Sequence, residues 1–116
     1  MPGPVDRYLA ALPANDWGTL RECLADDLVR NGPYHDVYRG RDEYLEFLVA
    51  TFAALRGYEL VVERVVEAGS TVLVELVETV DDGPARLRTA EAIVFDLDRN
   101  DRIARIAVYL QSSSRT

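Results

Sequence analysis

The stretch ARLRTAEAIVFDL, residues 85–97, alternates between two kinds of side chain, a pattern that predicts one long β-strand. One face of this strand would carry Leu87, Thr89, Glu91, Ile93, Phe95 and Leu97. The opposite face would carry two arginines and Asp96 among smaller residues, so the first face is the one that meets the core. Glu91 lies in the middle of that apolar row. Because a buried carboxylate is costly unless it is paired or protonated, Glu91 is the leading candidate functional residue.

The same alternation extends over the rest of the second half of the chain. It predicts three more strands, over residues 58–67, 71–80 and 102–111. The breaks between them are short and rich in Gly, Asp and Asn, so neighbouring strands are expected to form antiparallel hairpins.

In the first half of the chain, apolar residues instead follow the period of amphipathic helices. Helices are predicted over residues 5–12, after an N-cap at Asp16, and from an N-cap at Asp42 to about Arg56. The segment 28–40 is rich in turn residues and is expected to hold at most one short strand. Helices followed by a strand meander predict one α+β domain over residues 1–116, with a flexible tail at 112–116.

The composition removes several classes of chemistry. All thirteen cationic residues are arginines, so lysine Schiff-base catalysis is excluded. One histidine and one cysteine do not make a zinc site or a redox pair, and no Gly-x-Ser-x-Gly elbow is present. We therefore expect neither a metal nor a cofactor. The side chains that remain available for catalysis are the carboxylates, the tyrosines, the arginines, Asn31 and His35.

The net charge of −7, without a basic stripe, argues against nucleic acid and anionic membranes as partners. The N-terminus MPGPVD lacks a signal core, and the longest apolar stretch is too short to span a bilayer. With a single cysteine, the expected location is the cytoplasm.

Two further charged residues are expected on the inner face of the sheet. Glu78 shares the apolar face of its strand but lies near a hairpin end. If the second turn centres between residues 82 and 83, Glu78 and Glu91 lie about 13 Å apart. The same registers place Arg64 in one row with Glu91, which predicts an Arg64–Glu91 ion pair. The alternative is that Arg64 faces outward and Glu91 bonds a tyrosine or water.

The segments RYLAALPANDWGTL (7–20), LADDLVRNGPYHDVYRGRDEYLEFL (24–48) and AEAIVFDLDRNDRIARIAVYL (90–110) together resemble the nuclear transport factor 2-like superfamily. Its members include ketosteroid isomerases, limonene-type epoxide hydrolases and SnoaL-like polyketide cyclases. The resemblance implies a cone: about three N-terminal helices and a curved antiparallel sheet of four to six strands enclose an apolar pocket. It also implies a homodimer through the convex sheet face, which agrees with the apolar residues expected there, Leu73, Val77, Ala107 and Tyr109.

The resemblance carries over some site residues and not others. Tyr8 falls where ketosteroid isomerases place the phenol that hydrogen-bonds the enolate oxygen, while their general-base aspartate falls at Gly32 and their acid near Ile93. Asn31 and Glu78 match polar groups of the epoxide hydrolases. Three other positions of those enzymes are apolar here, namely Val29, Leu76 and Val108; the last is also where the cyclases keep an aspartate.

The turn 31–36 would lie at the mouth of the cone. It combines an amide, a phenol, an imidazole and a carboxylate, and neutral His35 beside an apolar cavity is suited to act as a base near pH 7. The alternative is a solvated loop in which Asp36 makes a local turn bond. Residues expected to contact the ligand are Trp17, Tyr34, Phe52, Arg64, Phe95 and Val108.

The sequence thus predicts a small cofactor-free acid/base enzyme acting on an apolar, oxygenated small molecule, by isomerisation, cyclisation, hydration or hydrolysis. Glu91 would transfer the proton or support its transfer, with Tyr8 and Asn31 as hydrogen-bond donors and Glu78 and His35 assisting. The alternatives are a non-catalytic binding or dimeric interaction module, and a filled cavity in which Glu91 is only structural.

Overall fold

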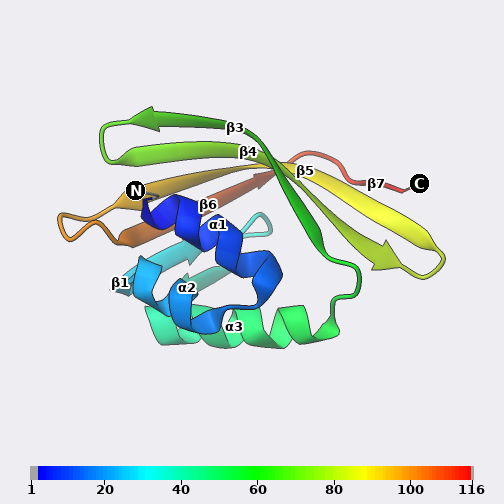
Figure 1. The fold of residues 1–116 in the computed structure, drawn as a ribbon, viewed down its shortest axis with the longest axis horizontal. Coiled ribbons are helices and arrows are strands. Elements are labelled where there is room, and N and C mark those ends of the chain that lie inside the picture. The colour runs from blue at the N-terminus through cyan, green and yellow to red at the C-terminus, as the bar shows by residue number, and fades with distance from the viewer. Residues whose placement is uncertain (1–2, 116) are drawn as a thin grey trace.

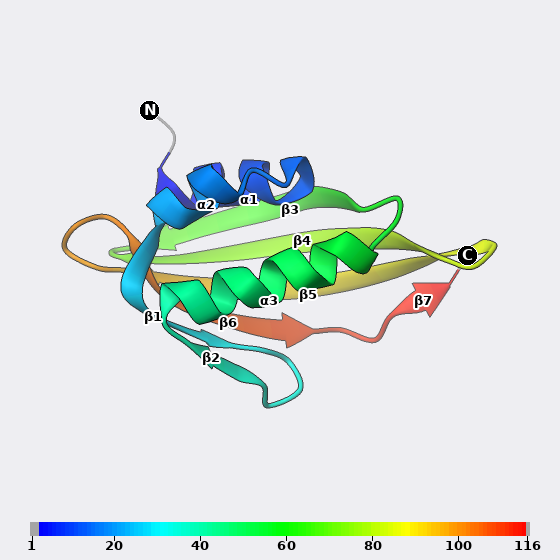
Figure 2. The ribbon, with the colours of Figure 1, turned by 90° about the horizontal axis from the view of Figure 1, so that it is seen from below.

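The computed structural model describes residues 3–115 and confirms the α+β architecture. Three helices, α1 (Pro4–Ala14), α2 (Trp17–Cys23) and α3 (Arg41–Ala54), lie along one side of a curved sheet (Figures 1 and 2). The strands are β1 (Leu24–Asn31), β2 (Val37–Arg39), β3 (Glu59–Ala68), β4 (Thr71–Asp82), β5 (Ala85–Leu97), β6 (Ile103–Leu110) and β7 (Ser114–Arg115). The predicted tail therefore includes a short strand, β7, which pairs with β5.

Two helix boundaries follow from capping residues. Asp16 is the N-cap of α2, where its carboxylate accepts a hydrogen bond from the Thr19 amide at 3.2 Å, as predicted. Pro13 lies inside the last turn of α1, and the helix ends at Asn15, whose left-handed conformation (φ 53°) closes it. The third helix begins after Gly40, at φ 91°, rather than after an Asp42 cap.

The main path of the sheet has the order β2-β1-β6-β5-β4-β3. The pairing of β1 with β6 is parallel and every other pairing is antiparallel, so the sheet is mixed rather than wholly antiparallel as predicted. The expectation of at most one short strand over 28–40 was wrong, because β1 extends to Asn31 and β2 follows it. Local sequence did not show β1 because its partner β6 comes from the other end of the chain.

The β4–β5 turn sets the spacing of the two inner carboxylates. It consists of Gly83 and Pro84, with Gly83 at φ 61°, so that Asp82 pairs with Ala85. This turn lies one residue later than predicted, which moves the register by two positions. Glu78 is opposite Thr89 and Leu76 is opposite Glu91, so Glu78 and Glu91 are diagonal neighbours. The wide separation predicted for these two carboxylates was therefore wrong.

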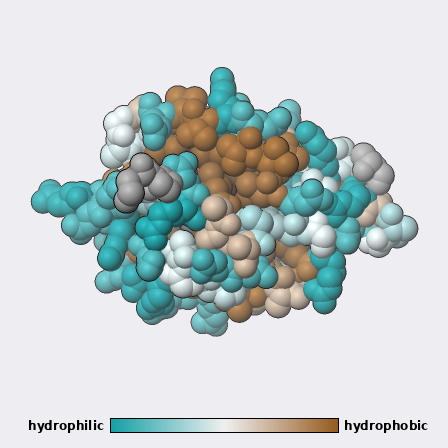
Figure 3. Space-filling model, in the orientation of Figure 1, coloured by the Kyte–Doolittle hydropathy of each residue, from teal (hydrophilic) through white to brown (hydrophobic). Residues whose placement is uncertain are grey.

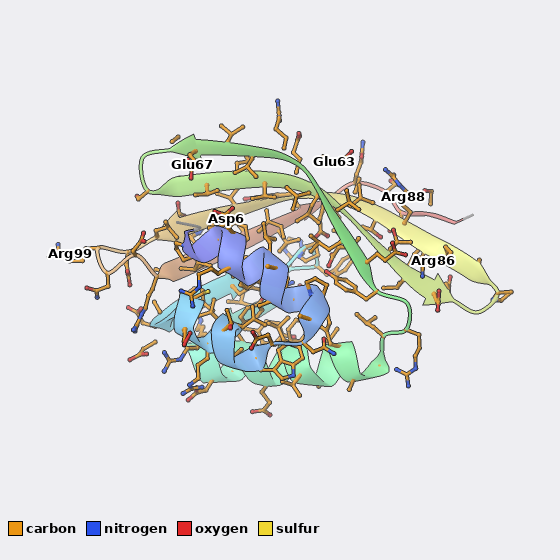
Figure 4. The ribbon with its side chains drawn as sticks, viewed as in Figure 1. Asp6, Glu63, Glu67, Arg86, Arg88 and Arg99 are labelled. Atoms are coloured by element: carbon orange, nitrogen blue, oxygen red, sulfur yellow. The ribbon has the colours of Figure 1, made fainter. Side chains whose placement is uncertain are left out.

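A bulge in β3 decides where Arg64 points. The register with β4 shifts between Val62 and Arg64, at Glu63, which Figure 4 labels on the bent strand. A one-residue slip sends the following side chains to the opposite face. Arg64 accordingly lies on the convex face, 63% exposed, with its Nε 2.8 Å from Glu75 Oε1. The predicted Arg64–Glu91 pair was therefore wrong. Its alternative was right in placing Arg64 outward and wrong about the partner of Glu91, which is hydrogen-bonded to Glu78 rather than to a tyrosine or water.

The core lies between the helices and the concave face. Its fully buried side chains include Leu20, Leu24, Leu28, Phe95 and Ile103.

On the convex face Val61, Val66 and Tyr109 are exposed, and the homodimer through this face stays a prediction. Apolar side chains also gather between α1 and β3, where Val62 and Val65 remain partly exposed (Figure 3). No helix within residues 3–115 has the length and apolar character needed to cross a membrane.

Candidate functional site

A cavity of about 280 Å³ lies between the helices and the concave face of the sheet. This volume is close to the lower end of the range, about 300–1,000 Å³, typical of small-molecule sites. Its wall is mostly apolar, with aliphatic side chains from β4, β5 and β6 and aromatic rings from α3. The ionisable side chains on the wall are Tyr8, Arg30, Tyr44, Tyr58, Glu78 and Glu91. The cavity is open and Glu91 lines it, as the enzyme hypothesis requires.

Glu78 and Glu91 form a carboxyl pair on this wall. Burial, a hydrogen bond to Glu78 and the negative charge of Glu78 together raise the pKa of Glu91 to about 9. Near neutral pH Glu91 is therefore protonated, and its carboxylic acid donates a hydrogen bond to Glu78. The Tyr58 hydroxyl donates a second hydrogen bond to Glu78 Oε2. Burial and the adjacent charge of Glu78 raise the pKa of Tyr58, which keeps this phenol neutral.

Tyr8 and Tyr44 form a second polar group, the tyrosine pair. Tyr8 projects from α1 and Tyr44 from α3, both are 2% exposed, and their hydroxyls are hydrogen-bonded to each other. Burial raises the pKa of both phenols, so both are neutral near pH 7. The positive charge of Arg30 opposes that rise in each case. The tyrosine pair thus offers a neutral phenol as a hydrogen-bond donor inside an apolar cavity.

Arg30 reaches the cavity from β1. Its side chain is 12% exposed, and its Nη1 lies 2.8 Å from Asp36 Oδ2 in the β1–β2 turn. Its guanidinium lies over three aromatic rings, with centroid distances of 5.9 Å to Tyr38, 5.7 Å to Tyr44 and 5.2 Å to Phe47. These are cation–π distances. The arginine is therefore fixed from several sides.

Five of the residues predicted from the sequence line the cavity: Tyr8, Phe52, Glu78, Glu91 and Val108. Two others lie behind its wall. Trp17 packs edge-on against Phe52 at 5.8 Å, and Phe95 packs edge-on against Tyr8 at 5.4 Å, with no exposure of its own. Arg64 lies on the convex face, as described above.

The remaining three predicted residues, Asn31, Tyr34 and His35, belong to the end of β1 and the turn after it and do not line the cavity. Tyr34 is 77% exposed, and His35 is exposed with a left-handed backbone (φ 65°). Asp36 accepts a local turn bond from the Tyr34 amide at 3.2 Å, in agreement with the solvated-loop alternative. Of this turn, only Pro33 contributes to the cavity wall.

Sequence reasoning missed Arg30, Tyr44 and Tyr58 as site residues. Tyr44 was detectable, because it shares the apolar face of the third predicted helix with Leu48 and Phe52. Arg30 was not, because β1 itself was not predicted. Gly32 explains one missing acid: a Cβ there would lie 2.2 Å from the Asp36 carboxylate and 2.4 Å from Arg30 Nη1. The Arg30–Asp36 pair thus occupies the space beside the position where ketosteroid isomerases place their aspartate.

No cluster suited to a metal ion occurs within residues 3–115, in the sense of three or more His, Cys, Asp or Glu side chains brought together. The ionisable groups on the cavity wall are instead a carboxyl pair, three phenols and one guanidinium. Such a set can donate, accept and return protons.

The chain belongs to the SnoaL-like domain family, whose model matches residues 5–106, within the nuclear transport factor 2-like superfamily. The structure is similar to that of an LEH-like epoxide hydrolase from Mycobacterium tuberculosis, with a TM-score of 0.82 and 28% identity over 93% of this chain and 80% of that one. It is also similar to a protein with a ketosteroid isomerase-like fold from Catenulispora acidiphila, with a TM-score of 0.80 and 19% identity over 94% and 85% of the two chains.

A third similar structure, assigned to the SnoaL-like polyketide cyclases, comes from Shewanella denitrificans. Its TM-score is 0.83 at 15% identity, over 93% of this chain and 88% of that one. No curated protein matches the sequence. The TM-scores of the second and third structures establish a shared fold, and their low identities leave the chemistry to the residues on the cavity wall.

Proposed function

We propose that this protein is an acid/base enzyme that converts an apolar, oxygenated small molecule inside the main cavity without a metal or organic cofactor. The observation that carries the proposal is the Glu78–Glu91 pair, two carboxyl groups that lie as diagonal neighbours on a mostly apolar cavity wall. The raised pKa of Glu91 keeps one proton in this pair near neutral pH. A pair in this state presents an acid and a base side by side near neutral pH. Strongly perturbed carboxyl groups in a cavity are typical of functional sites.

Each carboxyl group has a distinct role in this proposal. Glu78 carries the negative charge and accepts a proton from the substrate or from an attacking water. Glu91 is protonated and acts as the general acid, which transfers its proton to an oxygen or carbon atom of the substrate. The tyrosine pair donates a hydrogen bond to the substrate oxygen, while the apolar wall excludes water and orients the carbon skeleton.

Isomerisation, cyclisation and epoxide hydration all fit these roles, because each of them removes one proton and returns another. Supporting evidence comes from the LEH-like epoxide hydrolase, which is 28% identical to this chain. In such a reaction, water would lose a proton to Glu78 while Glu91 protonates the oxygen of the opening ring. Glu78 would thus act as the base, at a position where the resemblance to the epoxide hydrolases also implies a polar group. Glu91, on β5, would act as the acid.

The test is turnover of a substrate panel by the wild type and by Glu91→Gln. The panel contains cyclic epoxides and β,γ-unsaturated ketones, and chromatography follows their conversion. Glutamine keeps the size and the hydrogen bond to Glu78 but transfers no proton, so kcat/KM is expected to fall about 100-fold. The matched control is Glu75→Gln, which changes an exposed carboxylate on the convex face of β4 and leaves kcat/KM unchanged.

Turnover by Glu91→Gln at the wild-type rate would contradict the proposal. So would a protein that binds panel compounds in the cavity and converts none of them. The second result would favour a non-catalytic binding module.

A further inference from the structure

The strand β3 forms one border of the sheet and leaves a long edge open. It comes last in the strand order and pairs only with β4 within residues 3–115. The backbone N–H and C=O groups on its other side therefore have no strand partner in this part of the chain. Exposed edge strands are usually short, or carry proline or lysine, which prevent the addition of a further strand. β3 is ten residues long and contains neither residue.

The bulge at Glu63 brings apolar side chains from both halves of β3 to the concave face. Before the bulge, Val62 lies opposite Leu76 of β4, which belongs to the buried core. After it, Val65 lies opposite Val74, which belongs to the same core. Val62 and Val65 are themselves 40% and 43% exposed. The concave side of this edge thus carries apolar side chains that the helices do not cover.

These valines line a groove of about 400 Å³ between β3 and the first helix, which we name the α1–β3 groove. Figure 3 shows apolar surface at this place, and Figure 2 shows α1 along the same border of the molecule as β3. A strand added to the open edge would therefore have α1 on its concave side. The groove is lined by Asp6, Leu9, Ala10 and Pro13 of α1 and by Leu60, Val62 and Val65 of β3.

The free charges along this edge are acidic. Glu63 and Glu67 make no ion pair within residues 3–115. Arg64, the cation of the strand, is already paired with Glu75. At one end of the α1–β3 groove, Asp6 and Glu67 line the same hollow (Figure 4). Because opposite charges on neighbouring strands stabilise their pairing and like charges oppose it, this edge suits a strand with basic residues.

A second copy of this chain does not suit the edge. Its own β3 would bring three glutamates and a single arginine to an edge that is already acidic. Because α1 lies along this border, pairing through β3 would also bring the two α1 helices against each other (Figure 2). An extended peptide has no such helix and can carry the complementary charge.

We propose that the open edge of β3 and the α1–β3 groove form a binding site for an extended peptide that alternates apolar and basic residues. The peptide adds to the sheet as a further strand and exchanges backbone hydrogen bonds with β3. Its apolar side chains enter the groove, and its basic side chains lie near Glu63 and near the hollow of Asp6 and Glu67. This site lies outside the main cavity and does not rest on the proposed function.

The experiment measures the fluorescence anisotropy of a labelled peptide, Lys-Val-Lys-Val-Lys-Val-Lys, during titration with the full chain. Saturable binding to the wild type is expected, and the acidic peptide Glu-Val-Glu-Val-Glu-Val-Glu is expected to bind at least about tenfold more weakly. Val65→Lys places a cation in the groove and should weaken binding of the basic peptide by about tenfold. The matched control is Val49→Lys on α3, where the valine is also 43% exposed and the affinity should stay unchanged.

Two methylated peptides separate strand addition from attraction between charges alone. Methylation of the valine amides removes the N–H donors on one edge of the peptide strand, and methylation of the lysine amides removes those on the other edge. Only one edge faces β3, so one methylated peptide is expected to lose binding and the other to keep it. Equal effects of the two methylations would overturn the inference.

The oligomeric state and the cavity variant supply the remaining outcomes. A wild type that ignores the peptide and forms a dimer that Val65→Lys dissociates would assign the edge to a second copy, against the proposal. Peptide binding should be the same in Glu91→Gln as in the wild type, because Glu91 lies in the main cavity. The peptide site and the proposed enzyme therefore stand or fall separately.

Discussion

The Glu91→Gln variant is expected to be more stable than the wild type at pH 8.5 and to lose most of that advantage at pH 5.5. The reason is the pKa of Glu91, which is about 9 in the folded chain against an ordinary value of 4.5. Between these values the folded chain holds a proton that the unfolded chain has released. Raising the pH therefore favours the unfolded state, by at most about 1.4 kcal/mol per pH unit.

Glutamine carries no titrating proton and still donates a hydrogen bond to Glu78. Over the range from pH 5.5 to 8.5 the difference in free energy of unfolding between the two proteins should thus change by several kcal/mol, up to about 4 kcal/mol. Urea unfolding at pH 5.5, 7.0 and 8.5 measures it. Glu75→Gln serves as the control, because its exposed carboxylate lies on the convex face and should leave the slope of stability against pH as in the wild type. A difference that does not change with pH would mean that Glu91 is ionised in the folded protein.

Phe95→Ala is expected to lower the free energy of unfolding by about 3–5 kcal/mol, because it leaves a cavity in a well-packed core. Phe95 has no exposed surface and packs edge-on against Tyr8 from behind the cavity wall. Phe52, which the sequence placed in the same ligand-contacting group, lines the cavity itself and is only partly buried. Phe52→Ala should therefore cost less stability and weaken the binding of apolar ligands.

Denaturant unfolding and a ligand titration on both variants separate the two roles. We expect the larger loss of stability in Phe95→Ala and the larger loss of affinity per folded molecule in Phe52→Ala. A larger loss of affinity in Phe95→Ala than in Phe52→Ala would mean that Phe95, rather than Phe52, contacts the ligand.

Local periodicity was enough to predict the parts of the fold and site that depend on one element at a time. The alternation in residues 85–97 correctly placed Glu91 on the concave face, and the same alternation placed Glu78 there. The order of elements together with the resemblance led to the right family, and Tyr8 does line the cavity.

Features that depend on two elements at once were not predictable in this way. The bulge at Glu63 reverses the direction of Arg64, and periodicity within β3 does not show it. The turn at Gly83 and Pro84 fixes the approach of Glu78 to Glu91, and the sequence permitted a turn one residue earlier. Arg30 enters the site through a parallel pairing of β1 with β6, which only the folded sheet reveals.

The short turn between β4 and β5 has a consequence for how such a site is gained or lost over time. In the predicted register the two inward acids of this hairpin lie far apart. In the observed register, two positions away, they are neighbours that share a proton, although the amino-acid sequence is the same. A change in this turn that moves the register by two positions would therefore separate the two acids without replacing any residue of the wall. Comparing relatives only at their wall residues would overlook such a change, whereas comparing where the turn falls within their hairpins would detect it.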